Sequence, residues 1–153
     1  MNYEEKIKEL GYELPIAPKP LASYIPAVVT GNLIFTAGQV PLLNGELKYT
    51  GKVCDEETIE DGIRAARVCV LNCLSVIKNE LGSLDKIKRI VKITVFVNSA
   101  EHFTDQAKVA NGASDLLVEI FGENGKHARS AVGVNELPIN AAVEIEMIAE
   151  IKQ

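Results

Sequence analysis

An arginine and a glutamate near the end of the sequence are the residues best suited to chemistry. Arg129 begins an apolar segment after a glycine-rich loop, and Glu144 lies in the alternating run that follows, which we expect to form a neighbouring strand. A guanidinium can hold a carboxylate through two parallel hydrogen bonds, and a glutamate can accept and return protons. The pair could therefore hold a small anion and handle protons.

Each of these residues could instead have a purely structural role. Its position in the sequence, taken alone, favours that role over a catalytic one. Arg129 could form a surface or intersubunit salt bridge. Glu144, Glu146 and Glu150 share one face of the last predicted strand, because side chains alternate along a strand. Crowded carboxylates disfavour one another's ionisation, so one of them could act as an acid or a water-holding base. The commoner explanation is a charged face that discourages aggregation.

The other reactive residue types form no recognisable motif. His102 and His127 have no Cys or His neighbours at ligand spacing, and no glycine-rich loop opens a helix, so we expect no metal and no organic cofactor. Cys54, Cys69 and Cys73 are odd in number, and two of them are four residues apart on a predicted helix. They are interpreted as reduced, partly buried thiols.

The composition is typical of one small acidic domain. The chain has 153 residues and a formal net charge of −5, and it contains no cluster of basic residues interleaved with aromatic ones. This pattern argues against nucleic acid as a partner. The apolar stretches are far shorter than the ~20 residues that span a bilayer, and the first residues lack a hydrophobic secretion signal. We therefore expect a cytoplasmic protein without membrane attachment.

Turn residues and hydrophobic spacing predict a small set of helices and strands. Gly31 between two β-branched runs predicts a hairpin, and Asn44-Gly45 predicts a second turn. The first long helix should be capped by Asp55 or Thr58. In chain order the predicted elements are a peripheral helix at 3–10, a hairpin at 24–29 and 33–37, a helix at 59–81, a strand at 86–98, a helix at 104–121, and strands at 129–134 and 142–151. In the strand at 86–98, alternation places four residues on the dry face: Val91, Ile93, Val95 and Val97.

This order predicts an α+β fold with one mixed β-sheet and two helices packed on one face, because helices that connect neighbouring strands can cover only one side. Residues 1–23 are expected to form a short helix and a proline-rich arm, and residues 24–153 the main part of a single domain. The opposite sheet face places Phe96 and Ile148 among charged residues. Such a face needs a partner, and a symmetric oligomer would supply one.

Four segments, in unbroken order, carry a family resemblance. They are residues 31–41 (GNLIFTAGQVP), 92–97 (KITVFV), 128–133 (ARSAVG) and 137–146 (LPINAAVEIE). Together they resemble the RidA family, also called YjgF/YER057c/UK114, over residues 24–151. The longer N-terminal arm and the segments 49–53, 98–100 and 111–117 are similar to a longer bacterial branch of that family.

The resemblance implies a chorismate-mutase-like fold, a homotrimer and ligand clefts between subunits. It also implies hydrolysis of reactive 2-imino or enamine acids to 2-oxo acids and ammonia, as by a 2-iminobutanoate/2-iminopropanoate deaminase, without a cofactor. By this resemblance Arg129 would bind the substrate carboxylate, and Glu144 would position water and relay protons. Tyr24, Gly38 and Asn111 would be substrate-binding residues of the cleft.

The sequence departs from the family pattern around this predicted cleft. The usual Gly-Pro-Tyr-Ser-Gln is Ala-Ser-Tyr-Ile-Pro at residues 22–26, which places Ile25 and Pro26 after the tyrosine. Ala37 replaces a serine, and Ala131 replaces a cysteine, which argues against thiol chemistry at that position. Ser114 stands in place of a tyrosine, so the pocket would be roomier or more polar.

Three functions follow from these patterns. The first is an imine deaminase that needs Arg129 and Glu144. The second is a non-catalytic trimer that binds a small carboxylate and has a regulatory role. The third and least favoured is an endoribonuclease or translation inhibitor, because the acidic chain lacks a basic aromatic surface.

Overall fold

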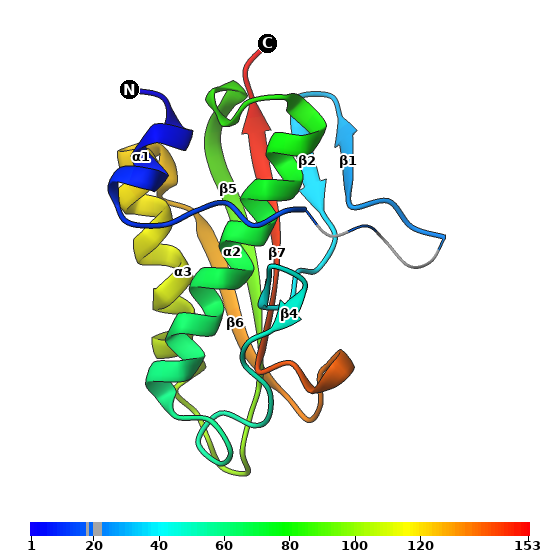
Figure 1. The fold of residues 1–153 in the computed structure, drawn as a ribbon, viewed down its shortest axis with the longest axis vertical. Helices are drawn as coiled ribbons and strands as arrows, with labels where there is room; N and C mark the ends of the chain where they lie inside the picture. The colour runs from blue at the N-terminus through cyan, green and yellow to red at the C-terminus, as the bar shows by residue number, and fades with distance from the viewer. Residues whose placement is uncertain (18, 20–22) are drawn as a thin grey trace.

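The structure, a computed structural model, describes residues 1–17, 19 and 23–153, so part of the predicted proline-rich arm lies outside the described residues. A five-stranded sheet forms its centre in the order β1-β2-β7-β5-β6 (Figure 1). The strands are β1 (Ala27–Thr30), β2 (Leu33–Thr36), β5 (Ile87–Asn98), β6 (Ala128–Val134) and β7 (Val143–Ile151). Only β5 and β6 run parallel, and the other neighbours are antiparallel. The predicted mixed sheet is confirmed.

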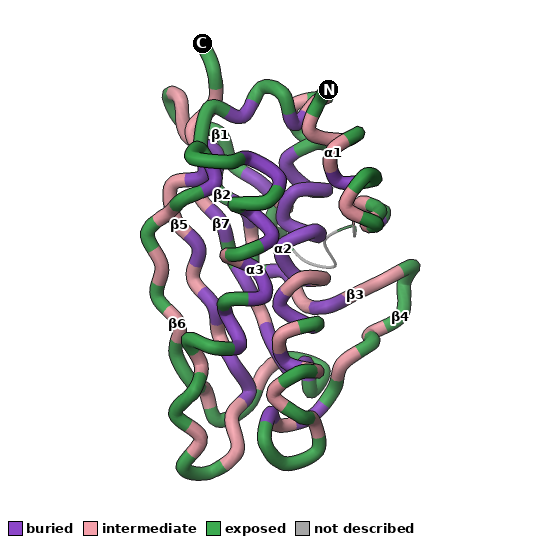
Figure 2. The backbone as a smooth tube through the Cα atoms, turned by 90° about the vertical axis from the view of Figure 1, so that its left-hand side faces the viewer, coloured by how far each residue is buried: buried purple, intermediate pink, exposed green. Residues whose placement is uncertain are grey.

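Two long helices, α2 (Ile59–Leu81) and α3 (Gln106–Phe121), lie side by side on one face of the sheet (Figure 1). Helix α2 begins after Thr58, which forms a capping box with Asp61, and ends at Gly82, whose φ is 89°. Of the two predicted caps, Thr58 is therefore correct. Figure 2 shows buried residues along α2 and along the central strands β5 and β7. No helix in the described part of the chain is long and apolar enough to cross a membrane.

Strand β5 contains an irregularity that its alternating sequence conceals. Its pairing with β7 shifts register between Ile90 and Lys92. Ile90 and Ile93 are fully buried, whereas Val91 is only partly buried. The prediction that Val91 shares the dry face with Ile93 is therefore wrong, because a β-bulge interrupts the period-two alternation.

The N-terminal helix α1 (Tyr3–Glu9) packs against the hydrophobic core through one side of its surface. Ile7 is 1% exposed, and the ring centroids of Tyr3 and Phe121 are 4.4 Å apart. The helix is confirmed, and its predicted peripheral position agrees with its burial, because Ile7 is the only one of its seven residues that is buried.

The predicted hairpin and the predicted second turn are both present, and the second turn also belongs to a hairpin. The hairpin of β1 and β2 turns at Gly31, but β1 begins at Ala27, so Tyr24 lies before the sheet. The second hairpin joins β3 (Leu42–Leu43) to β4 (Glu46–Leu47). Short 3₁₀ turns occupy Leu84–Lys86, Gly122–Gly125 and Pro138–Asn140.

The sheet face opposite the helices carries a strip of apolar side chains. Val28 pairs with Phe35, and Phe35 pairs with Ile148. Paired residues point to the same side of a sheet, so the three side chains adjoin across β1, β2 and β7. Val28 is 49% exposed and Phe35 is 37% exposed. In the isolated chain this strip therefore faces solvent.

Candidate active site

Glu144 lies on the open face of the sheet, where it lines a cavity of about 320 Å³. Its neighbours Val143 and Ile145 are fully buried beneath the helices, so alternation turns Glu144 to the other side. Two predicted ligand-binding residues, Tyr24 and Gly38, line the same cavity. The described lining residues are Lys19, Tyr24, Pro26, Gly38, Gln39, Val40, Leu42, Pro138, Ile139 and Glu144.

Gly38 leaves room for the Glu144 carboxyl group. A Cβ atom at position 38 would lie 2.9 Å from Glu144 Cδ and 3.0 Å from Oε2. The backbone holds this contact in place, because Gln39 N donates to Ile145 O at 2.8 Å and Ile145 N donates to Gln39 O at 3.0 Å. At Gly38, which was predicted to bind substrate, the side chain in closest approach is thus that of Glu144.

Glu144 differs from the other two acidic residues on its face of the strand. Glu150 accepts hydrogen bonds from Lys88 Nζ at 3.0 Å and Asn32 Nδ2 at 3.1 Å, so its role is structural. Within the described residues, the Glu144 carboxylate has no hydrogen bond or ion pair to another side chain. Burial raises the pKa of Glu144, and the neighbouring charge of Glu146 raises it further. Glu144 is therefore suited to proton transfer.

Arg129 is held against helix α3 by two polar side chains. Its Nη1 donates to Asn111 Oδ1 at 2.8 Å and to Ser114 Oγ at 3.1 Å. Asn111 and Ser114 are three residues apart on α3, so they face β6 together. The structure thus brings together Arg129 and Asn111, both predicted site residues. No carboxylate in the described part of the chain forms a salt bridge with Arg129, so its charge is available to an anion.

His127 supports Arg129 indirectly, through a hydrogen bond to Ser114, and we did not predict this role from the sequence. His127 Nδ1 lies 2.6 Å from the Gly125 carbonyl oxygen, so it carries the proton, and Nε2 accepts from the Ser114 hydroxyl at 2.9 Å. Burial lowers the pKa of His127, and the Arg129 charge lowers it further. The spacing of the two residues could have indicated this role. Residues 127 and 129 are two apart, so their side chains point to the same side of an extended chain.

The two halves of the predicted site do not meet within one chain. Strand β5 separates β6 from β7, and Arg129 pairs with Ile93, which faces the helices, whereas Glu144 pairs with Phe96 on the open face. The expectation that Arg129 and Glu144 lie side by side on neighbouring strands is therefore wrong. The cause is the sheet order, since β7 returns between β2 and β5 and leaves β6 at the edge.

The cysteines do not contribute to either half. Cys69 and Cys73 are fully buried on α2, and burial raises the pKa of Cys73 to about 12. The prediction of buried thiols is confirmed for these two, but Cys54 is exposed, because it lies in a surface turn with a φ of 71°. The described residues contain no group of three or more His, Cys, Asp or Glu side chains placed to hold a metal ion.

The mixed sheet and the helices on one of its faces define a small α+β domain that carries two separate groups of polar side chains. Residues 4–151 match the family described as "YjgF/chorismate mutase-like, putative endoribonuclease". The chain belongs to this family, which is the RidA family of the sequence resemblance, and its fold is chorismate-mutase-like.

Three relatives show how close the similarity is. Protein TCP17 of Trypanosoma cruzi is 44% identical over 146 residues, which are 95% of this chain and 91% of that protein. The crystal structure of Atu1372 from Agrobacterium tumefaciens, of unknown function, is 43% identical with a TM-score of 0.93 and covers 98% of this chain and 92% of that one. A 2-iminobutanoate/2-iminopropanoate deaminase from Dermatophagoides farinae is 32% identical and covers 90% of this chain and 93% of that protein.

Proposed function

We propose that the protein hydrolyses 2-imino acids, or their enamine tautomers, to 2-oxo acids and ammonia. The observation that carries the proposal is an arginine held by Asn111 without a carboxylate partner among the described residues, together with a partly buried glutamate, Glu144, that lines a cavity and has a raised pKa. The relative from Dermatophagoides farinae that is named a 2-iminobutanoate/2-iminopropanoate deaminase supports the choice of substrate.

The two halves would form one active site between copies of the chain. Arg129 lies on the helix side of the edge strand, and Glu144 lies on the open face. The apolar strip of Val28, Phe35 and Ile148 supplies a surface for a second copy, because burying it would remove exposed apolar area from water. The family resemblance supports a homotrimer with three intersubunit clefts as that assembly.

In such a cleft each half has a distinct role. Arg129, held by Asn111 and Ser114, would pair with the substrate carboxylate and fix the position of C2. Glu144 would accept a proton from water as its oxygen bonds to C2 and the imine nitrogen is protonated. Glu144 would then return its proton to the nitrogen of the resulting carbinolamine. The C–N bond breaks to release ammonia, and the hydroxyl group gives up its proton as C2 becomes the carbonyl carbon. A raised pKa suits Glu144 to this work, because proton transfer is most efficient when the pKa lies near the working pH.

The direct test generates 2-iminopropanoate or 2-iminobutanoate with an amino-acid oxidase and traps the remaining imine. We expect the protein to accelerate imine loss, and Arg129→Ala and Glu144→Gln each to lower kcat/KM by about 10²-fold or more. The matched controls are Arg64→Ala, which removes an exposed arginine paired with Asp61, and Glu150→Gln, which lies on the same strand as Glu144 but does not line its cavity.

Other outcomes would point to the other functions. Saturable binding of 2-oxobutanoate that needs Arg129, without acceleration of imine loss, would indicate a carboxylate-binding regulatory protein. RNA cleavage that disappears in Arg129→Ala would instead support the endoribonuclease of the family description. Full imine hydrolysis by Arg129→Ala would contradict the proposed role of the guanidinium.

A further inference from the structure

The turn at Pro138–Asn140 holds an isoleucine in a backbone conformation that isoleucine disfavours. Ile139 has φ 52° and ψ 24°, and Asn140 has φ 60°. Ala141 N donates to Pro138 O at 3.1 Å, which closes the turn. Two successive residues with positive φ are the pattern of a type I′ turn, for which glycine and asparagine are preferred. A β-branched residue with positive φ is a true outlier and costs about 1–3 kcal/mol.

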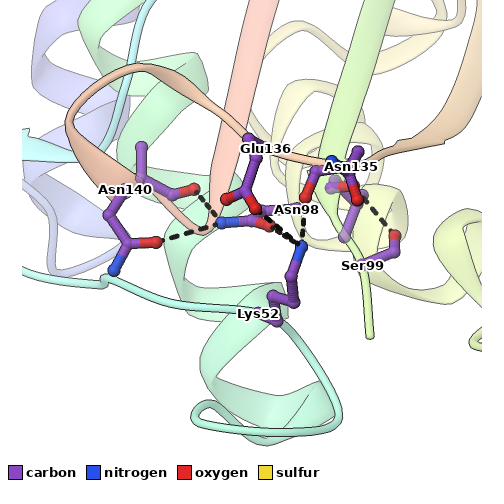
Figure 3. Close-up of polar contacts among 8 residues, drawn as sticks. Lys52, Asn98, Ser99, Asn135, Glu136 and Asn140 are labelled. Atoms are coloured by element: carbon purple, nitrogen blue, oxygen red, sulfur yellow. Dashed lines mark hydrogen bonds and ion pairs between the residues drawn. The ribbon is translucent and has the colours of Figure 1, made fainter. Parts of the chain in front are cut away.

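A polar network around the buried Asn98 keeps this turn in place (Figure 3). Lys52 Nζ donates to Asn98 Oδ1 at 3.1 Å and to the Asn135 carbonyl oxygen. Asn98 is completely buried, and its Nδ2 donates to Ala141 O at 3.1 Å. From the preceding loop, Gly51 N donates to Asn140 O at 2.8 Å. The turn is therefore bound on both sides, which is the condition under which backbone strain persists.

Packing inside the chain does not account for the isoleucine. The Ile139 side chain is 66% exposed and belongs to no core cluster of the described residues. It lines the cavity that also contains Glu144 and Tyr24. Strained residues concentrate at ligand-binding and catalytic sites, and this one projects an apolar side chain beside a catalytic carboxylate.

We infer that Ile139 is a specificity-determining residue that forms an apolar wall for the side chain of the substrate. This inference rests on the proposed function. If the carboxylate is bound at Arg129 and C2 faces Glu144, the side chain on C2 extends along the rest of the cavity, where Pro138 and Ile139 lie. The wall favours an imino acid with an ethyl side chain over one with a methyl side chain, because the extra carbon gains an apolar contact.

The experiment compares kcat/KM for 2-iminobutanoate with kcat/KM for 2-iminopropanoate. Ile139→Gly removes the wall while keeping a residue that accepts the positive φ, so the ratio should fall about fourfold, the equivalent of one buried CH₂ group. The matched control is Asn140→Gly, which changes the same turn at a residue that does not line the cavity. Its ratio should stay within about twofold of the wild-type ratio, a difference of less than one CH₂ group.

Thermal unfolding and light scattering complete the test. The unfolding midpoint of Ile139→Gly should equal or exceed that of the wild type, since glycine relieves the strain. An unchanged substrate ratio in an active Ile139→Gly protein of wild-type oligomeric state would overturn the inference. If the wild type hydrolyses neither imine, the proposed function fails. The inference about Ile139 is then tested by measuring the affinities for 2-oxobutanoate and pyruvate with calorimetry. Equal loss of both affinities in Ile139→Gly would also overturn it.

Discussion

Replacing Gly38 by alanine should reduce catalysis strongly while leaving the fold intact. The new Cβ would lie 2.9 Å from Glu144 Cδ, whereas carbon atoms in contact prefer about 3.5–4.0 Å. The carboxyl group must therefore move by roughly 0.6–1 Å, and a displacement of this size costs about 10²-fold in rate. Stability should change by less than about 1 kcal/mol, because the displaced atoms end a flexible side chain and alanine reduces the entropy of the unfolded chain.

The assay for Gly38→Ala combines kcat/KM for imine hydrolysis with the midpoint of thermal unfolding. Gly112→Ala is the matched control, because its Cβ would lie 2.2 Å from the carbonyl oxygen of Ile63, where α2 and α3 pack together. That variant should lose about 1–3 kcal/mol of stability or more, since two packed helices must separate. Wild-type kcat/KM in Gly38→Ala would refute the placement of Glu144 as the proton-transfer group.

Three further predictions follow from the same site. Glu144→Gln should be more stable than the wild type at pH 7, because a raised pKa means that ionisation of Glu144 opposes folding. The difference in stability should vanish below the ordinary glutamate pKa of 4.5, where the carboxyl group is protonated in both the folded and the unfolded chain. Denaturant unfolding at a series of pH values measures this difference. The lowered pKa of His127 predicts that the wild type loses stability as pH falls below the ordinary histidine pKa of 6.5, because the unfolded chain then binds a proton more readily than the folded one. A His127→Gln variant that loses stability just as steeply would contradict this assignment to His127. Ser114→Ala removes one hydrogen bond to Arg129 and should raise KM about fivefold with kcat nearly unchanged; a loss confined to kcat would assign Ser114 another role.

Local chemistry was enough to predict most of the elements of this fold. The turn at Gly31, the Thr58 cap and the spacing of apolar residues in both long helices depend only on nearby residues, and the structure contains each of them. The bulge beside Val91 was not predictable, because nothing in an alternating run marks where one residue is left out of the pairing.

The candidate site was only partly predictable, for a reason of topology. The residue types at Arg129 and Glu144 indicated carboxylate binding and proton transfer, but which strands are neighbours depends on how the whole chain packs. Strand β7 inserts beside β5, so two residues in consecutive strands lie on opposite faces. Gly38 and His127 acquire their roles only through this packing, because their partners are distant in sequence or belong to another element.

Mixing two inactive variants tests the central claim most directly. Arg129→Ala keeps the Glu144 half of the site, and Glu144→Gln keeps the Arg129 half, so equal amounts of the two are unfolded and refolded together. If each cleft takes one half from each of two copies, about a quarter of the clefts in a randomly mixed closed ring contain both intact halves. We therefore predict recovery of about a quarter of wild-type imine hydrolysis. Mixed oligomers with no more activity than either variant alone would contradict a site shared between copies.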